Sequence, residues 1–231
     1  MSIAEKLQTV ADNQQKVYDA GFAAGQASGG DTNAAYQAGV HSVYENMTLV
    51  NYMFYRGHNK NNYETFLNSD LSDVTSAQYL FQENDWIVEF ALPITFRPSL
   101  IHYLFQNCKT IKKVSGLERL QTNVITGVFS DCVALEDAGT IDFTKVGFAN
   151  RTFLNCTALK EIRIAGTIGL SVDFQYSPLS KASIESIMAA LSDTTTGISV
   201  TFSNIAVNAA FTTDEWNALV ATKPNWTVTL V

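Results

Sequence analysis

A four-residue block that begins with Phe and ends with Cys occurs three times in the chain at a constant interval. The blocks end at Cys108, Cys132 and Cys156, so that successive copies are 24 residues apart. A fixed interval of this length is typical of stacked supersecondary units, because a single unit cannot bury its apolar face alone. The repeat therefore predicts a stack of similar units. The positions that define it are Phe105, Cys108, Phe129, Cys132, Phe153 and Cys156.

The interval is kept at other positions of the unit. Leu100, Val124 and Phe148 form one apolar column, and a diverged fourth copy precedes the first block, with Asn84 in place of the cysteine. We therefore assign residues 67–177 to four repeat units. A buried column of thiols is expected at the cysteine positions, since three cysteines at one repeat position do not form an even disulfide framework.

Residues 1–30 carry apolar side chains at alternating steps of four and three, which is the seam of a coiled-coil heptad. β-branched residues at the d positions favour three or four strands over a parallel dimer, so a homotrimer is the favoured state. The segment is expected to oligomerise or to attach the protein to an assembly. The alternative is a helix that lies against its own domain or a larger scaffold. The predicted oligomerisation positions are Ile3, Leu7, Val10, Gln14 and Val17.

Residues 31–66 combine a helical junction with a stretch that is rich in aromatic side chains and asparagine. Tyr and Arg provide contact area at a low entropic cost, so this composition is typical of a recognition surface. In the alternative interpretation, the rings cover the open first unit of the stack. The candidate binding residues are Tyr52, Tyr55, Arg56, His58, Asn59 and Tyr63.

Residues 178–231 show a helix-then-strand order twice, which suits a cap over the last repeat unit. Ser180 is placed to N-cap the first helix, and Thr212 with Glu215 has the spacing of a capping box at the start of the second. Alternating apolar residues over 198–202 and 226–230 predict the two strands.

The repeat pattern F-x-[N/D]-C-x-x-[L/I]-x-x-[V/A/I] resembles the BspA-type (treponemal) leucine-rich repeat of bacterial surface and phage-associated proteins, over roughly residues 80–175. Residues 206–211 and 225–230 resemble the endings of leucine-rich-repeat proteins that phages and prophages of gut Firmicutes encode, and residues 4–7 and 17–21 are similar to their usual start. The resemblance implies a tail-fibre or baseplate role. The expected fold class is α+β, with an N-terminal helical, coiled-coil-like segment, a short leucine-rich-repeat solenoid and a helix–strand C-terminal cap.

Charge and motif content argue against several other functions. The net charge of −7 disfavours nucleic acid, whose binding requires clustered Lys and Arg. No apolar run reaches about 18 residues, so membrane insertion is not expected, and the first residues lack the pattern of a signal peptide. His41, His58 and His102 adjoin no nucleophile motif, and metal-ligand spacings are missing. We therefore expect no enzyme activity, no metal site and no cofactor.

These observations combine into one functional hypothesis. The protein is expected to be a structural and receptor-binding component of a phage or prophage tail fibre or tail tip, located in the virion tail. It is expected to associate with itself as a homotrimer. Its other expected partners are virion tail proteins and a host cell-surface glycan or protein. A bacterial cell-surface adhesin is the first alternative. A glycan depolymerase, whose acidic residues meet only in space, is the second.

Overall fold

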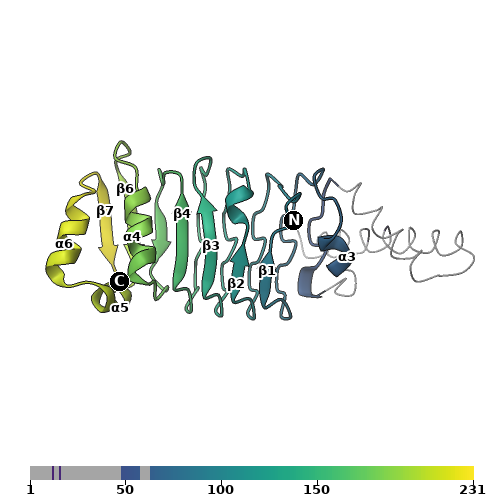
Figure 1. Ribbon diagram of the computed structural model, residues 1–231, viewed down its shortest axis with the longest axis horizontal. Coiled ribbons are helices and arrows are strands. Elements are labelled where there is room, and N and C mark those ends of the chain that lie inside the picture. The colour runs from purple at the N-terminus through teal and green to yellow at the C-terminus, as the bar shows by residue number, and fades with distance from the viewer. Residues whose placement is uncertain (1–11, 13–15, 17–47, 58–62) are drawn as a thin grey trace, which may run out of the picture.

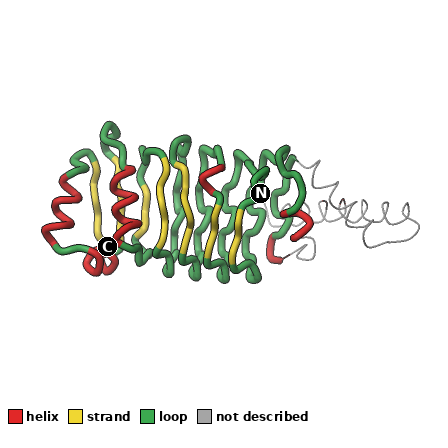
Figure 2. Tube along the Cα trace, viewed as in Figure 1, coloured by secondary structure: helices red, strands yellow, loops and turns green. Residues whose placement is uncertain are grey.

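The computed structural model of the protein describes residues 12, 16, 48–57 and 63–231. The described chain forms an elongated stack whose strands lie side by side across the long axis (Figure 1). Loops and turns make up most of the backbone between the strands, and most of the helices lie towards the two ends of the described stack (Figure 2).

Within the described residues, the strands form two separate sheets in which every pair is parallel. The first sheet contains β1 (Glu89–Ala91), β2 (Lys113–Ser115), β3 (Asp137–Asp142) and β4 (Glu161–Ala165), in that order. The second contains β5 (Val172–Phe174), β6 (Ile198–Phe202) and β7 (Trp226–Leu230). The helices are η1 (Tyr55–Gly57), α3 (Tyr63–Leu67), η3 (Leu117–Arg119), α4 (Lys181–Ala190), α5 (Asn204–Ala210) and α6 (Thr213–Ala221).

The 24-residue interval sets the register of the first sheet. Lys113 in β2 pairs with Glu89 in β1 and with Asp137 in β3, and Asp137 pairs in turn with Glu161 in β4. Side chains alternate between the two faces of a strand, so the interval that pairs the strands also stacks their inward residues. These buried inward residues are Phe90, Val114, Ala138 and Ile162.

A second backbone ladder is built from turns, over residues 50–56, 77–83, 101–107, 125–131 and 149–155; we call it the turn ladder. Alternate N–H groups of one turn donate to carbonyl groups of the next: Tyr103 to Thr126 at 3.0 Å, for example. Two positions in each 24-residue unit have a φ between 56° and 64°. This conformation costs a non-glycine residue roughly 1–2 kcal/mol, which the ladder bonds offset. One column of such positions is Tyr79, Tyr103, Gly127 and Arg151, and the other is Glu83, Asn107, Asp131 and Asn155.

A column of phenylalanine rings runs through the core of the stack. Neighbouring rings are stacked, with centroids 4.8–6.1 Å apart and interplanar angles of at most 24°. The column continues from the first sheet region into the second, and so joins the two parts of the molecule. Its members are Phe54, Phe81, Phe105, Phe129, Phe153, Phe174 and Phe202.

The three cysteines form a second buried column beside the rings. Each thiol donates to the carbonyl oxygen of the phenylalanine one unit before: Cys108 to Phe81 at 2.9 Å, for instance. Asn84 takes the same role in the preceding unit, because its side-chain amide donates to the carbonyl of Phe54 at 3.2 Å. The repeat position therefore requires a small buried donor, which either Cys or Asn supplies.

Helix α4 closes the outer edge of the first sheet. Ser183 accepts a hydrogen bond from the N–H of Ile162 at 3.0 Å, and Ser186 accepts one from Ile164 at 3.1 Å. These N–H groups belong to β4 and would otherwise be left at an open sheet edge. Because α4 occupies this edge, no further strand of the described chain pairs with β4, and the second sheet begins separately.

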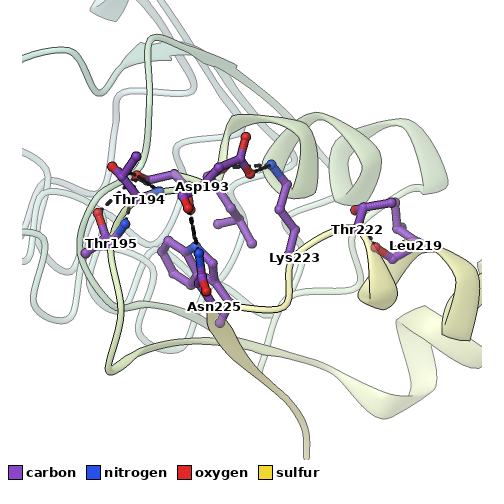
Figure 3. A network of polar contacts seen from close by, with 10 residues as sticks. Asp193, Thr194, Thr195, Leu219, Thr222, Lys223 and Asn225 are labelled. Carbon is purple, nitrogen blue, oxygen red and sulfur yellow. Dashed lines mark hydrogen bonds and ion pairs between the residues drawn. The ribbon is translucent and has the colours of Figure 1, made fainter.

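A polar network fixes the last coil of the chain (Figure 3). Lys223 donates to the carbonyl of Leu191 at 2.8 Å and to the carboxylate of Asp193 at 2.9 Å. Asn225 donates to the carbonyl of Asp193 at 2.6 Å. The indole of Trp226 donates to the carbonyl of Ser192 at 2.8 Å. The loop before β7 is thereby tied to the loop before β6, two segments about 30 residues apart in sequence.

The predicted fold class, α+β with one leucine-rich-repeat solenoid, is wrong for the described residues. The described chain is mixed α/β, with two small parallel sheets and helices placed between the strands of the second. The reason is local: α4 ends the first sheet, and the pairs of the second sheet are 28 residues apart rather than 24, as Val172 with Val200 and Ile198 with Trp226. The predicted coiled-coil positions Ile3, Leu7, Val10, Gln14 and Val17 lie outside the described residues.

Candidate functional site

A polar hollow of about 640 Å³ lies where the turn ladder ends and the second sheet begins. Its size falls within the range of sites for small molecules, roughly 300–1,000 Å³. Tyr103 provides an aromatic wall, and most of the remaining lining side chains carry hydroxyl, amide or charged groups. The lining residues are Tyr103, Thr126, Ala149, Asn150, Arg151, Ser171, Val172, Asp173, Ser199 and Thr201.

The hollow coincides with a break in the turn ladder. In the preceding unit, the N–H of Ile125 donates to Phe148 at 2.8 Å and that of Gly127 donates to Asn150 at 3.0 Å. The corresponding N–H groups of Ala149 and Arg151 find no acceptor among the described residues. Both residues line the hollow, as do Ser171, Val172 and Asp173 of the next segment. Backbone donors of this kind are available to a ligand oxygen.

A stack of tyrosine rings leads into the hollow. Tyr52 and Tyr79 stack with their centroids 4.6 Å apart, and Tyr79 and Tyr103 stack at 5.0 Å. Burial raises the pKa of the Tyr52 and Tyr79 phenols above the ordinary value, so both remain neutral at physiological pH. Tyr103 is the last ring of the stack and is held from one side by the two others.

The stack ends at Tyr103 because the next position in the column is Gly127. A Cβ atom at Gly127 would lie 2.3 Å from Cδ1 and Cε1 of the Tyr103 ring, well inside contact distance. The φ of Gly127, +62°, also favours glycine. Gly127 therefore allows the Tyr103 ring to lie over the backbone at the edge of the hollow.

The charged groups of the hollow come from two different elements, Arg151 from the last turn of the turn ladder and Asp173 from β5. Arg151 is exposed and forms no ion pair within the described chain. Asp173, on the β5 side, accepts hydrogen bonds from the backbone N–H of Gln175 at 2.9 Å and from its side-chain amide at 3.2 Å. Ser171 accepts one from the N–H of Ser199 at 3.0 Å. One side is therefore basic and rich in donors, and the other offers a carboxylate and hydroxyl groups.

The aromatic stretch that the sequence singled out lies mainly inside the molecule. Tyr52, Tyr55 and Tyr63 are only 1%, 4% and 8% exposed. Tyr63 packs edge-on against Phe54, Phe81 and Trp86 at centroid distances of 4.7–6.0 Å. These three rings are therefore buried in the part of the chain that the structure describes.

Arg56 is exposed, unlike the other candidate residues that the structure describes. Its guanidinium forms a 2.7 Å ion pair with Glu83, which occupies the equivalent position one unit later in the turn ladder. His58 and Asn59 lie outside the described residues. The repeat positions Phe105, Cys108, Phe129, Cys132, Phe153 and Cys156 are all buried.

Sequence reasoning missed the residues of the hollow. Tyr79, Tyr103, Gly127 and Arg151 share one repeat column, so a table of the chain at 24-residue intervals shows a change from tyrosine to glycine to arginine. That change marks the site. The loss of the ladder partners at Ala149 and Arg151 has no comparable signal in the sequence, since it depends on where the next strand is placed.

Metal-ligand clusters and membrane-spanning helices would indicate other kinds of site in the part of the chain that the structure describes. No cluster of three or more His, Cys, Asp or Glu side chains there is arranged to hold a metal ion. The described helices are all too short or too polar to cross a bilayer. Comparisons of the chain with protein-family models, with curated proteins and with solved structures found no match.

Proposed function

We propose that the protein is a non-catalytic receptor-binding component of a phage or prophage tail fibre or tail tip, and that the hollow beside Tyr103 is its receptor site. The observation that carries the proposal is the set of open donors, the N–H groups of Ala149 and Arg151, in a hollow that also holds an unpaired guanidinium. Polar groups fixed by a rigid backbone are suited to bind a host-surface glycan or protein.

The surroundings of the hollow support binding without conformational adjustment. The turn ladder and the first sheet bond each unit to the next on one side, and the pairs of the second sheet fix β5 and β6 on the other. Preorganised groups lose little entropy when a ligand binds, which increases the affinity.

A binding role is favoured over glycan cleavage by the carboxylates of the site. Hydrolysis of a glycosidic bond uses two carboxyl groups roughly 5–9.5 Å apart. The lining of the hollow contains one, Asp173. A depolymerase is therefore the weaker candidate.

The tail-fibre assignment rests on the sequence. The heptad pattern at Ile3, Leu7, Val10, Gln14 and Val17 supports a homotrimer, and the resemblance to phage-encoded proteins supports contact with other tail proteins in the virion. A cell-surface adhesin is the alternative, and it would use the same hollow.

The receptor role is tested by binding of the fluorescently labelled full-length protein to a panel of bacteria that includes gut Firmicutes. We expect at least one strain to bind, and Arg151→Gln to weaken that binding by about tenfold or more, since a hydrogen bond to a charged group contributes roughly 1.5–3 kcal/mol. Arg97→Gln removes an exposed guanidinium that does not line the hollow and serves as the matched control. Binding that is the same for all three proteins, or absent on every strain, contradicts the receptor role.

The tail assignment needs a separate experiment. Antibody labelling of purified virions should place the protein on the tail, and its mass in solution should be that of a trimer. A monomeric protein that is absent from virions contradicts the assignment to a tail, whereas labelling of bacterial surfaces instead supports the adhesin.

A further inference from the structure

We propose that the ligand of the hollow is an acidic saccharide, bound with its anionic group towards Arg151 and its hydroxyl groups towards Asp173. The inference rests on the proposed receptor function and specifies its chemistry. Three features of the site carry it: the open donors, the aromatic wall and the opposite polarity of the two sides.

The donor side selects an anion. The N–H groups of Ala149 and Arg151 have no acceptor in the described chain, and the guanidinium of Arg151 has no carboxylate partner there. A carboxylate or phosphate oxygen satisfies such donors with charge-assisted hydrogen bonds, which are about twice as strong as neutral ones. In a chain of net charge −7, an unpaired cation beside two open backbone donors is a local exception that favours one anionic group rather than a dense polyanion.

The aromatic wall favours a sugar ring over a bare anion. Tyr103 lines the hollow, and Tyr79 stacks on it at 5.0 Å, so the ring is fixed in place. Tyr79 stacks on one face of the ring and the backbone of Gly127 lies close to Cδ1 and Cε1, so Tyr103 offers the hollow an apolar ring edge. Such an edge can contact the C–H groups of a pyranose ring while its hydroxyl groups remain free to form hydrogen bonds. Inorganic phosphate alone would leave this wall unused.

The opposite side of the hollow is suited to hydroxyl groups. Asp173 keeps acceptor capacity beyond its two bonds to Gln175, because an ionised carboxylate has about four lone-pair positions. The hydroxyl of Thr201 has no hydrogen-bond partner in the described chain. A carboxylate on this side also repels a second anion, which fixes the direction in which an acidic saccharide enters.

The test is calorimetry of the full-length protein with paired oligosaccharides. The probes end in glucuronic acid, galacturonic acid or sialic acid, each with its methyl ester, and a hexose phosphate with its parent hexose. We expect at least one acid to bind about 10- to 100-fold more tightly than its uncharged partner, as a charged hydrogen-bonded group predicts. Whether the uronic acids, the sialic acid or the phosphate show this difference identifies the source of the anion.

Three substitutions locate the binding in the hollow. Arg151→Gln should abolish the preference for the acid over its ester, whereas Asp173→Asn should retain or increase it. Gly127→Ala should weaken the binding of every saccharide tested, because the added Cβ displaces the Tyr103 ring. Gly197→Ala is the matched control: it has a similar φ, +73°, but no atom within 4 Å of the added Cβ.

The outcomes separate this inference from the receptor function. If labelled protein binds cells through Arg151 but every acid binds no better than its partner, the acidic-saccharide inference fails and the receptor function stands. If Arg151→Gln changes neither cell binding nor the preference for acids, both fail. Equal losses from Gly127→Ala and Gly197→Ala contradict the role of the Tyr103 wall.

Discussion

At the scale of single residues, the buried thiols show how one repeat position is used. Cys108, Cys132 and Cys156 are fully buried, and each donates to a backbone carbonyl. Desolvation raises the pKa of Cys108 and Cys156 to about 12 and raises that of Cys132 as well. The thiols therefore stay protonated, which makes them hydrogen-bond donors rather than nucleophiles.

This burial predicts a loss of stability at alkaline pH. The unfolded thiols release their protons near pH 9 while the folded ones keep theirs, so above this pH the native state binds more protons than the unfolded state. The free energy of unfolding should then fall as pH rises, by at most about 1.4 kcal/mol per thiol and pH unit. Urea titrations at pH 7, 8, 9 and 10 measure the slope.

A control separates the thiols from other groups that titrate in this range. Cys132→Ala should be less stable than the parent at pH 7 but should show a shallower decline above pH 9, since one titrating thiol is gone. In the native state at pH 8, the three thiols should also be inert towards a disulfide reagent. Rapid labelling, or equal slopes for the two proteins, would count against this account.

At the scale of elements, the hydroxyl groups of α4 replace a neighbouring strand. Ser183 is 1% exposed and accepts from Ile162, and Ser186 accepts from Ile164. Removal of both hydroxyls leaves two N–H groups of β4 without partners, each at a cost of roughly 1–3 kcal/mol. The double variant Ser183→Ala/Ser186→Ala should therefore lose about 2–6 kcal/mol of unfolding free energy in chemical denaturation.

The control for this variant is Ser72→Ala, which truncates an exposed serine outside any helix or strand. It should change the unfolding free energy by less than about 0.5 kcal/mol, as surface substitutions usually do. A double α4 variant as stable as this control would show that water satisfies the edge of β4 and that the serines are dispensable.

Several elements followed from local sequence chemistry. Ser180 caps α4, and Thr212 with Glu215 forms the capping box of α6, both as predicted. The alternating residues over 198–202 and 226–230 form β6 and β7. These signals are short-range, since each involves side chains and backbone groups within a few residues. The interval of 24 residues likewise anticipated which positions pair in the first sheet.

The features that could not be predicted depend on contacts between distant residues. The pairing of Ser183 with Ile162 spans 21 residues and reverses the usual role of a helix serine, so nothing in the local sequence indicates that the sheet ends there. Tyr52 and Tyr63 belong to a stretch whose composition is typical of a recognition surface, but tertiary packing buries both side chains. The hollow depends on the lack of a side chain at Gly127 and on the lack of described acceptors for the N–H groups of Ala149 and Arg151. No sequence motif predicts either feature.

At the scale of the whole molecule, the polar network of Figure 3 decides how firmly the last coil is held. Lys223 is the central donor of this network, and its side chain is only 10% exposed. Lys223→Met keeps the aliphatic stem but removes both bonds to the 191–193 loop. We expect hydrogen exchange to accelerate about tenfold or more in β7 and α6, because unfolding free energies are local in stacked architectures.

The first sheet should be little affected by this change. Exchange in β1 to β3 should remain within about twofold of the parent protein, since stacked units depend mainly on their neighbours. Lys145→Met, at an exposed position without an ion pair in the described chain, is the control and should leave both regions unchanged. Faster exchange throughout the stack in Lys223→Met would contradict local unfolding and indicate a single cooperative unit.

The direction of the backbone ladders has a mechanical consequence. The strands lie across the long axis, so the hydrogen bonds between them, and those of the turn ladder, lie along it (Figure 1). A force applied along this axis acts on the bonded interfaces between units in series, so each carries the full force and the weakest opens first; the interfaces do not share the load in parallel. Each 24-residue unit that opens lengthens the chain by up to about 80 Å. Pulled from its ends, this molecule would yield stepwise and at low force, as an extensible spacer rather than a rigid rod.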